Sequence, residues 1–214
     1  MTLKRTGVSK KPQRRQRTDV RRTQIADAAR AVVVKCGSEH VTVRVIAREI
    51  GVSEGALYRH FKSKHDILSL MVERVEEDLV KDIEERSVGG GAPLEVLESS
   101  LRNHVSAIQQ RRGVSFQVVA EIISLGDKRL SKQASQALDA YTSRIRTILL
   151  LGAKAGQIRA SVDADTAAIL IAATLQGLVS RWALSGYAFD LEQEFDSVWS
   201  ILRTAVASEG NHES

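Results

Sequence analysis

The sequence has few cysteine, proline and aromatic residues, and each scarcity excludes some classes of protein. Cys36 is the only cysteine among 214 residues, which excludes a disulfide framework and fits a reducing cytosol. Two prolines and 4% aromatic residues, beside 43% hydrophobic residues, favour an all-helical chain with a sizeable core. No apolar run approaches the roughly 18 to 20 residues of a membrane span, and the charged N-terminus lacks the hydrophobic segment of a secretory signal. We therefore expect a cytoplasmic protein of one or two domains that does not associate with membranes.

Sequence signatures of catalysis are also missing. The chain has no Walker sequence, no GxGxxG motif and no nucleophile elbow. Its five histidines, at positions 40, 60, 65, 104 and 212, do not have the spacing of zinc ligands. We predict that the protein is not an enzyme and that it uses neither a metal nor a cofactor.

Charge is unevenly distributed along the chain. Residues 1–65 contain 16 Lys and Arg against 5 Asp and Glu, a net charge of +11. The remainder contains 15 against 21, a net charge of −6. A basic first third joined to an acidic remainder indicates nucleic-acid binding confined to one end of the molecule.

The first 17 residues carry seven basic side chains and no acidic one. With Pro12, Gly7 and few large apolar residues, this arm is expected to be disordered in isolation. It could neutralise DNA phosphates or enter a minor groove, or it could be a solvated tail without a defined role. A first helix is expected from about Thr18 to Lys35, because apolar residues repeat there at helical spacing and Gly37 follows.

Residues 41–64, VTVRVIAREIGVSEGALYRHFKSK, predict two short helices joined by a tight turn. Val43, Ile46, Ala47 and Ile50 lie on one face of the first helix. After a turn at glycine 51, Ser53 is a natural N-cap for a second helix over about 54–60. Two short helices meeting across such a turn form a helix-turn-helix, although an ordinary helical hairpin has the same periodicity.

The order of residues in this segment closely resembles the DNA-binding signature of TetR-family transcriptional regulators. Val45 departs from the pattern, because many members have an acidic residue there. The resemblance implies that the helix-turn-helix spans 42–61 and that Thr42, Tyr58, His60 and Lys64 hold phosphates. Arg44, Gly55, Ala56 and Arg59 are the candidates for contacts near the bases. Tyr58 and His60 could instead be packing residues, and Glu54 would either accept from a cytosine amino group or sit aside. The candidate DNA-binding residues are Thr42, Arg44, Ser53, Glu54, Gly55, Ala56, Tyr58, Arg59, His60 and Lys64.

Beyond the helix-turn-helix the periodicity stays helical. We expect about nine helices in all, including one at 64–86 that begins at Ser63 and Asp66, followed by a flexible connection at residues 89–93. Further helices are expected near 94–110, 114–124, 128–155, 163–185 and 191–207. The predicted organisation is a basic arm (1–17), a DNA-binding domain (18–64), a helical effector-binding and dimerisation domain (65–207) and a tail (208–214).

The last two expected helices are the candidates for a subunit interface. Residues 167–184 are nearly apolar all round, so that helix must be buried on several sides. Packed against the same pair from a second subunit, they would form a four-helix interface, and the resemblance implies such a homodimer; an intramolecular core in a monomer is the alternative. The candidate interface residues are Leu175, Leu178, Trp182, Leu191, Phe195, Val198, Trp199 and Leu202.

Polar and aromatic residues on otherwise apolar helices are the candidates for effector binding, although each could be an ordinary core residue. They are His104, Gln109, Phe116, Tyr141 and Trp182. The apolar helices suggest an unidentified effector that is apolar or amphipathic.

The resemblance implies a homodimeric regulator, most simply a repressor, that binds a double-stranded DNA operator in the cytoplasm at the nucleoid. A ligand in the C-terminal domain would change the separation of the two DNA-binding domains. The same segment also resembles the nucleoid-occlusion member of the superfamily, which uses DNA binding to regulate a cytoskeletal partner. That alternative is a DNA-bound interaction protein, and an enzyme is the third class considered.

Overall fold

A computed structural model describes residues 11–74 and 91–208, with side chains from Val20 onward. It is all helical over these ranges, apart from an isolated bridge between Ile158 and Ala207, so the predicted fold class is confirmed. An unlabelled helix covers 64–74 after α3. The labelled elements are α1 (Lys11–Cys36), η1 (Ser38–His40), α2 (Val43–Glu49), α3 (Glu54–Tyr58), α5 (Pro93–Gln110), α6 (Val114–Leu125), α7 (Lys128–Lys154), α8 (Ala164–Leu184) and α9 (Leu191–Val206).

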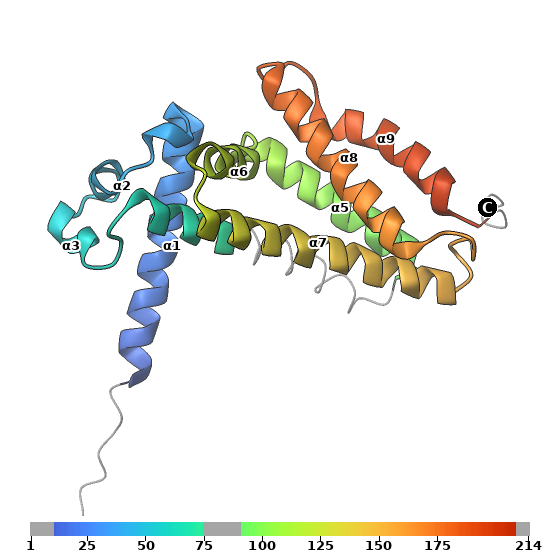
Figure 1. Cartoon of the computed structure of the whole chain (residues 1–214), viewed down its shortest axis with the longest axis horizontal. Helices are drawn as coiled ribbons and strands as arrows, with labels where there is room; N and C mark the ends of the chain where they lie inside the picture. Colours follow the sequence, from blue (N-terminus) through green and yellow to red (C-terminus); the bar gives the residue numbers. More distant parts are fainter. Residues whose placement is uncertain (1–10, 75–90, 209–214) are drawn as a thin grey trace, which may run out of the picture.

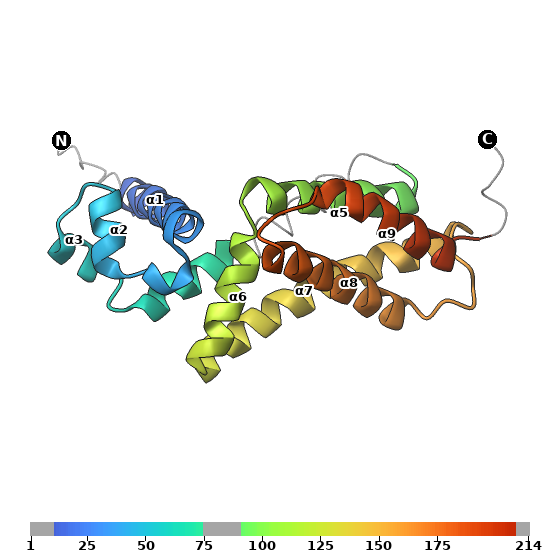
Figure 2. The same ribbon diagram turned by 90° about the horizontal axis from the view of Figure 1, so that it is seen from above.

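The helices form two groups along the long axis of the molecule (Figure 1). α1, α2 and α3 lie at one end, and α5, α7, α8 and α9 lie at the other. α6 stands between the two groups, as the view turned by 90° also shows (Figure 2). The N-terminal part of α1 extends away from the body of the molecule.

Side-chain caps explain where several helices begin. The hydroxyl of Thr42 accepts from Val45 N at 3.2 Å, and that of Ser53 accepts from Ala56 N at 3.3 Å, so α2 and α3 each satisfy a free amide. Thr42 therefore caps α2 without the acidic partner that Val45 replaces. Asp127 and Asp163 do the same for α7 and α8, and these hydrogen bonds hold the pKa of both carboxyls below the usual value.

The first apolar core is built from α1 and the helix-turn-helix. Ile25, Ala29, Ile46 and Ala47 are fully enclosed, and Leu57 of α3 packs with them. Because α3 has five residues, its position depends on this packing and on its N-cap rather than on its own helical stability. Leu57 and Phe61 lie four residues apart, and both side chains are buried in this core.

The first core does not end with the DNA-binding domain. Val114, Val118 and Ile122 of α6 and Leu130 of α7 belong to the same cluster as the residues of α1 and α2. Phe116, on another face of α6, packs instead against the second core. We predicted a domain boundary at residue 64. In the structure, α6 and the start of α7 lie beyond that boundary in the sequence but pack against the DNA-binding domain.

The second core is a four-helix arrangement. α5 packs against α7 and α9, and α8 packs against the same two helices. Their buried faces meet in one cluster that includes Leu101, Ile145, Ile171 and Phe195. By length and composition α8 could cross a membrane, contrary to our expectation for any apolar run, but 44% of its most apolar window is buried inside the molecule.

Most helix boundaries agree with the predicted ranges, and the largest difference is at the N-terminus. α1 begins at Lys11, within the arm that we expected to be disordered. Pro12 lies in its first turn, where proline is tolerated, and the residues that follow are good helix formers. Of the helix predicted at 64–86, only residues 64–74 can be compared, because 75–86 lie outside the described residues. The start of the predicted connection at 89–93, the first ten residues of the arm and most of the tail also lie outside them.

Candidate nucleic-acid interface

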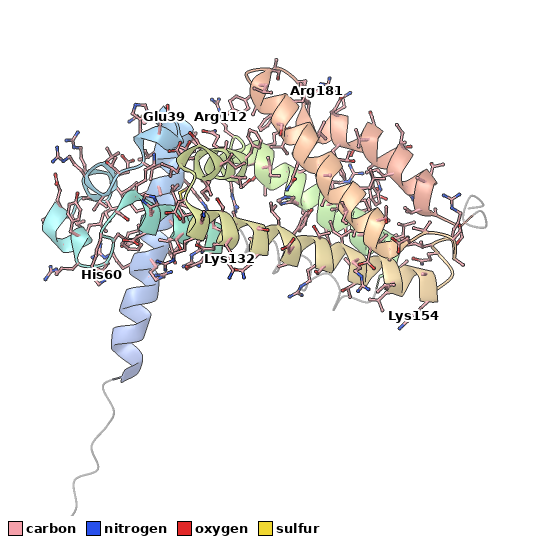
Figure 3. All side chains as sticks on the ribbon, viewed as in Figure 1. Glu39, His60, Arg112, Lys132, Lys154 and Arg181 are labelled. Atoms are coloured by element: carbon pink, nitrogen blue, oxygen red, sulfur yellow. The ribbon has the colours of Figure 1, made fainter. Side chains whose placement is uncertain are left out.

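α2, α3 and the turn between them present one face to solvent. Val52 N donates to Ala47 O at 3.0 Å, and Gly51 has φ of +69°, a left-handed conformation that glycine adopts without strain. This turn directs Leu57 into the core and leaves the opposite face of α3 open. Figure 3 shows the side chains of this end of the molecule, with His60 labelled.

Most of the predicted DNA-binding residues lie on this open face. Tyr58 as a whole residue is 46% exposed, so it is not packed under the turn, and His60 is also exposed rather than partly buried. A Cβ built on Gly55 would contact nothing within 4 Å, so the space in front of α3 is clear. The structure brings together the exposed residues Thr42, Arg44, Ser53, Glu54, Gly55, Tyr58, Arg59 and His60, with Ala56 partly exposed beside them.

An ion pair crosses between the two helices of the motif. Arg44 Nε lies 3.3 Å from Glu54 Oε1, and the two side chains are 68% and 47% exposed. Glu54 lies in the first turn of α3, where its charge alone would repel phosphate. Its contact with Arg44 offsets that charge and keeps both groups on the exposed face.

Lys64 is the exception among the predicted residues. Its ammonium donates to Glu121 Oε1 at 2.7 Å and to the backbone oxygen of Glu39 at 3.2 Å. The side chain is 21% exposed. In this structure Lys64 is therefore engaged by α6 and η1 rather than presented beside α3.

The five predicted effector-binding residues do not form one group. Gln109 Oε1 accepts from Leu191 N at 2.7 Å and Glu192 N at 3.2 Å, so it caps α9. Trp182 donates through Nε1 to Phe189 O at 2.8 Å and stacks edge-on against Tyr187. Both have structural roles, and Phe116 is partly buried against the second core.

His104 and Tyr141 do lie together, between α5 and α7. Their ring centroids are 5.3 Å apart. Burial and, to a smaller extent, the nearby charge of Arg111 lower the pKa of His104 to about 4, so the ring is neutral at pH 7. Burial also raises the pKa of Tyr141 well above its usual value.

Polar atoms without partners accompany this pair. Among the described residues, Tyr141 OH, Ser100 Oγ and Trp199 Nε1 are buried without a hydrogen bond. Ser100 precedes His104 by one helical turn on α5, so both face the same side. We did not single out Ser100 from the sequence; its spacing from His104 was the available signal. A buried hydroxyl without a partner costs about 1–3 kcal/mol, which a bound ligand could recover.

The predicted dimer residues face the inside of the protomer, and their place in a subunit contact stays a prediction. Leu175, Leu178, Trp182, Leu191, Phe195, Trp199 and Leu202 are at most 9% exposed and belong to the second core, while Val198 packs against it. These seven side chains therefore pack within their own protomer. α8 is also apolar on its opposite side. Its outer side carries Ile169, Leu170 and Leu184 at 61%, 52% and 86% exposure, and α9 carries Ile201 at 72%.

No group of three His, Cys, Asp or Glu side chains that could hold a metal occurs among the residues that the structure describes. A groove of about 420 Å³ runs between α5 and α9 and is lined partly by Arg102, Trp199 and Arg203. Arg102 is already paired with Glu98 and Asp196. This groove does not include the His104–Tyr141 pair.

Comparisons with known proteins agree with this geometry. Residues 25–71 match the profile described as bacterial regulatory proteins of the tetR family, and residues 71–205 match the C-terminal region of YsiA-like proteins. A fatty acid metabolism regulator protein from Bacillus subtilis (strain 168) is 27% identical over 187 residues, covering 86% of this chain and 94% of that protein. The nucleoid occlusion factor SlmA of Serratia proteamaculans (strain 568) is 26% identical over 170 residues, covering 78% and 84%.

A solved structure gives the same fold. The transcriptional regulator FadR from Bacillus subtilis, in complex with stearoyl-CoA, superposes with a TM-score of 0.72 at 25% identity, covering 84% of this chain and 96% of that one. The helix-turn-helix match at residues 25–71 and the match over 71–205, which is more than half of the chain, together show that the protein belongs to the TetR family of bacterial transcriptional regulators.

Proposed function

We propose that this TetR-family regulator is a homodimeric repressor that binds an operator through α2 and α3 and releases it when an amphipathic small molecule enters the second core. The observation that carries the DNA-binding part is the exposed, basic face of the helix-turn-helix over a buried Leu57. A face of this kind enters a major groove, where base edges can be distinguished.

Residues on that face divide into two roles under this proposal. Thr42, Tyr58 and His60 contact phosphates and set the position of α3. Arg59 and Arg44 lie nearest the bases, and an arginine can bind guanine through two hydrogen bonds. Glu54 positions Arg44 through their ion pair and is the acceptor available for a cytosine amino group. The remaining candidates, Ser53, Gly55 and Ala56, allow close approach of the helix to the groove.

The second subunit is proposed to pack on the outer faces of α8 and α9. Exposed Ile169, Leu170 and Leu184 flank Gly177 on α8, and no atom lies within 4 Å of a Cβ built there. A small residue between larger apolar ones allows two copies of α8 to cross closely. Exposed Ile201 of α9 extends the surface. A symmetric pair would place its two copies of α3 in successive major grooves, roughly 34–36 Å apart.

The effector is proposed to bind beside His104 and Tyr141. The surrounding residues, such as Ile145, are apolar, whereas Ser100 Oγ and Tyr141 OH are unpaired in the described structure. Such a site suits a molecule with a long apolar part and one polar end. The similarity to a regulator solved with stearoyl-CoA makes long-chain acyl compounds the first to test.

The direct experiment is selection of binding sites from a random duplex library, followed by titration of the selected operator. Arg59→Ala is expected to reduce the binding free energy by about 1–3 kcal/mol and to relax the base preference at one position. Stearoyl-CoA added to the complex is expected to release the DNA. If no sequence is enriched, the operator-binding part of the proposal is wrong; equal affinity with and without acyl compounds would exclude them as the effectors.

The similarity to SlmA supports a second candidate, a DNA-bound protein that regulates a protein partner. A partner captured on the immobilised operator, and absent without DNA, would favour this candidate. We propose no catalytic activity, because the similar proteins named above are regulators and the exposed face is suited to binding DNA.

A further inference from the structure

The helix that follows α3 begins in a region occupied by the protein's own carboxylates. Asp66 Oδ2 accepts from Lys62 N at 2.6 Å and from Ser63 N at 3.2 Å. Free amides at a helix start are good phosphate ligands. Asp66 accepts from the two amides that directly precede this helix.

The Lys64 ammonium is held by an acidic group from a different part of the chain. Glu121 of α6 accepts from Lys64 through Oε1 at 2.7 Å and from Ser38 Oγ through Oε2 at 3.2 Å. The Lys64 and Glu121 side chains are 21% and 14% exposed, so water screens this pair less than it screens a surface pair. The backbone oxygen of Glu39 accepts from the same ammonium at 3.2 Å.

A neighbouring contact repeats the arrangement. His65 Nε2 lies 3.5 Å from Asp127 Oδ2, at the junction of α6 and α7. Two successive residues at this helix start therefore face acidic groups supplied by α6 and the turn after it. Glu121 is the only acidic residue in α6, whose other side chains include Val118 and Ile122 in the first core.

We propose that Glu121 competes with the DNA backbone for the Lys64 ammonium, so that α6 sets how many phosphates each protomer can neutralise. This proposal rests on the DNA-binding function proposed above. A phosphate must displace the carboxylate of Glu121 before it can form an ion pair with the Lys64 ammonium. Since α6 packs against both cores, a shift of α6 that separates Glu121 from Lys64 would release a positive charge for DNA.

The test measures binding to a 24-base-pair duplex of mixed sequence over a series of salt concentrations. Glu121→Gln keeps the size of the side chain and its capacity to accept from Ser38, while removing the charge. For each protomer, this variant is expected to bind about five- to tenfold more tightly near 0.1 M salt, with a slope of log K against log salt steeper by about 0.9. Adding Lys64→Met to Glu121→Gln should restore the wild-type slope.

Asp139→Asn is the matched control, because it removes one negative charge from an exposed position of α7. It should leave the slope unchanged. Equal gains in affinity for the two variants would mean that net charge alone is responsible, and an unchanged slope in Glu121→Gln would also overturn the proposal. If wild-type protein shows no salt-dependent DNA binding, the DNA-binding function fails instead.

Lys64→Met alone provides an independent measurement if Glu121→Gln does not fold, which circular dichroism would reveal. Because Glu121 already holds Lys64, this single change should alter the slope by much less than 0.9 per protomer. A full loss of about 0.9 per protomer would show that Lys64 contacts phosphate without competition, and would refute the proposal.

Discussion

Ile201 and Ile123 offer a controlled test of the proposed subunit interface. Each side chain is 72% exposed in the single chain, but Ile201 lies on α9 and Ile123 lies on α6. Replacing either isoleucine with aspartate removes the same apolar side chain, and the two side chains are equally exposed in the single chain. Any difference between the variants must therefore come from what covers the two positions in the assembled protein.

The magnitude follows from the exposed fraction. Full burial of a large aliphatic side chain contributes about 1.5–3 kcal/mol, of which about three quarters remains to be gained at Ile201 when a partner covers it. Each protomer then contributes about 1–2 kcal/mol, and the symmetric pair about 2–4 kcal/mol. Ile201→Asp should weaken the dimer about 30- to 700-fold, since 1.4 kcal/mol corresponds to a factor of ten.

Sedimentation over a series of protein concentrations measures the dimer dissociation constant directly. Ile123→Asp should dimerise like the wild type, and both variants should retain their helical circular dichroism. Operator binding by Ile201→Asp should become dependent on protein concentration in the range where the dimer dissociates. Equal weakening by the two substitutions, or none by either, would refute the assignment of the outer faces of α8 and α9 to the subunit contact.

Three further predictions concern the second core and the N-terminal arm. Tyr141→Phe removes a buried hydroxyl that has no partner, so the effector-free protein should gain about 1 kcal/mol and melt about 2–4 °C higher; a lower melting temperature would contradict the unpaired state of that hydroxyl. The pKa of His104 is about 4 in the folded chain and 6.5 for an ordinary histidine side chain, so the unfolded chain binds more protons between these values; stability should fall as the pH drops from 6.5 to 4, and urea titrations should show a weaker fall for His104→Gln. Deleting residues 1–17 and 208–214 should flatten the salt dependence of DNA binding, and an unchanged slope would remove the arm from the interface.

The DNA-binding face could be predicted from the sequence because its determinants are local. Ser53 caps α3 by accepting from the amide of Ala56, three residues ahead, and Leu57 and Phe61 are spaced to contact one core. These relationships span a few residues, so periodicity and capping preferences reveal them. The same reasoning predicted the ranges of α5 to α9 to within one or two residues.

Other features depend on residues far apart in the sequence and could not be predicted in this way. Glu121 reaches Lys64 across 57 positions, and Gln109 caps α9 across 82. Neither partnership leaves a periodic pattern in the chain. The dimer face could not be chosen from the sequence for a different reason: periodicity locates an apolar stripe but cannot decide which of two apolar sides of α8 meets its own protomer.

A helix with apolar residues on two opposite sides links assembly to the abundance of the protein in the cell. When copies are scarce, each newly made chain leaves Leu184 and Ile169 in water, and a contiguous exposed apolar surface attracts chaperones, proteases and other chains. In the proposed dimer, pairing hides that surface, and by mass action pairing becomes more complete as synthesis continues. Turnover would therefore be fastest for unpaired chains, and a cell that makes little of this regulator would hold less of it than its rate of synthesis alone implies.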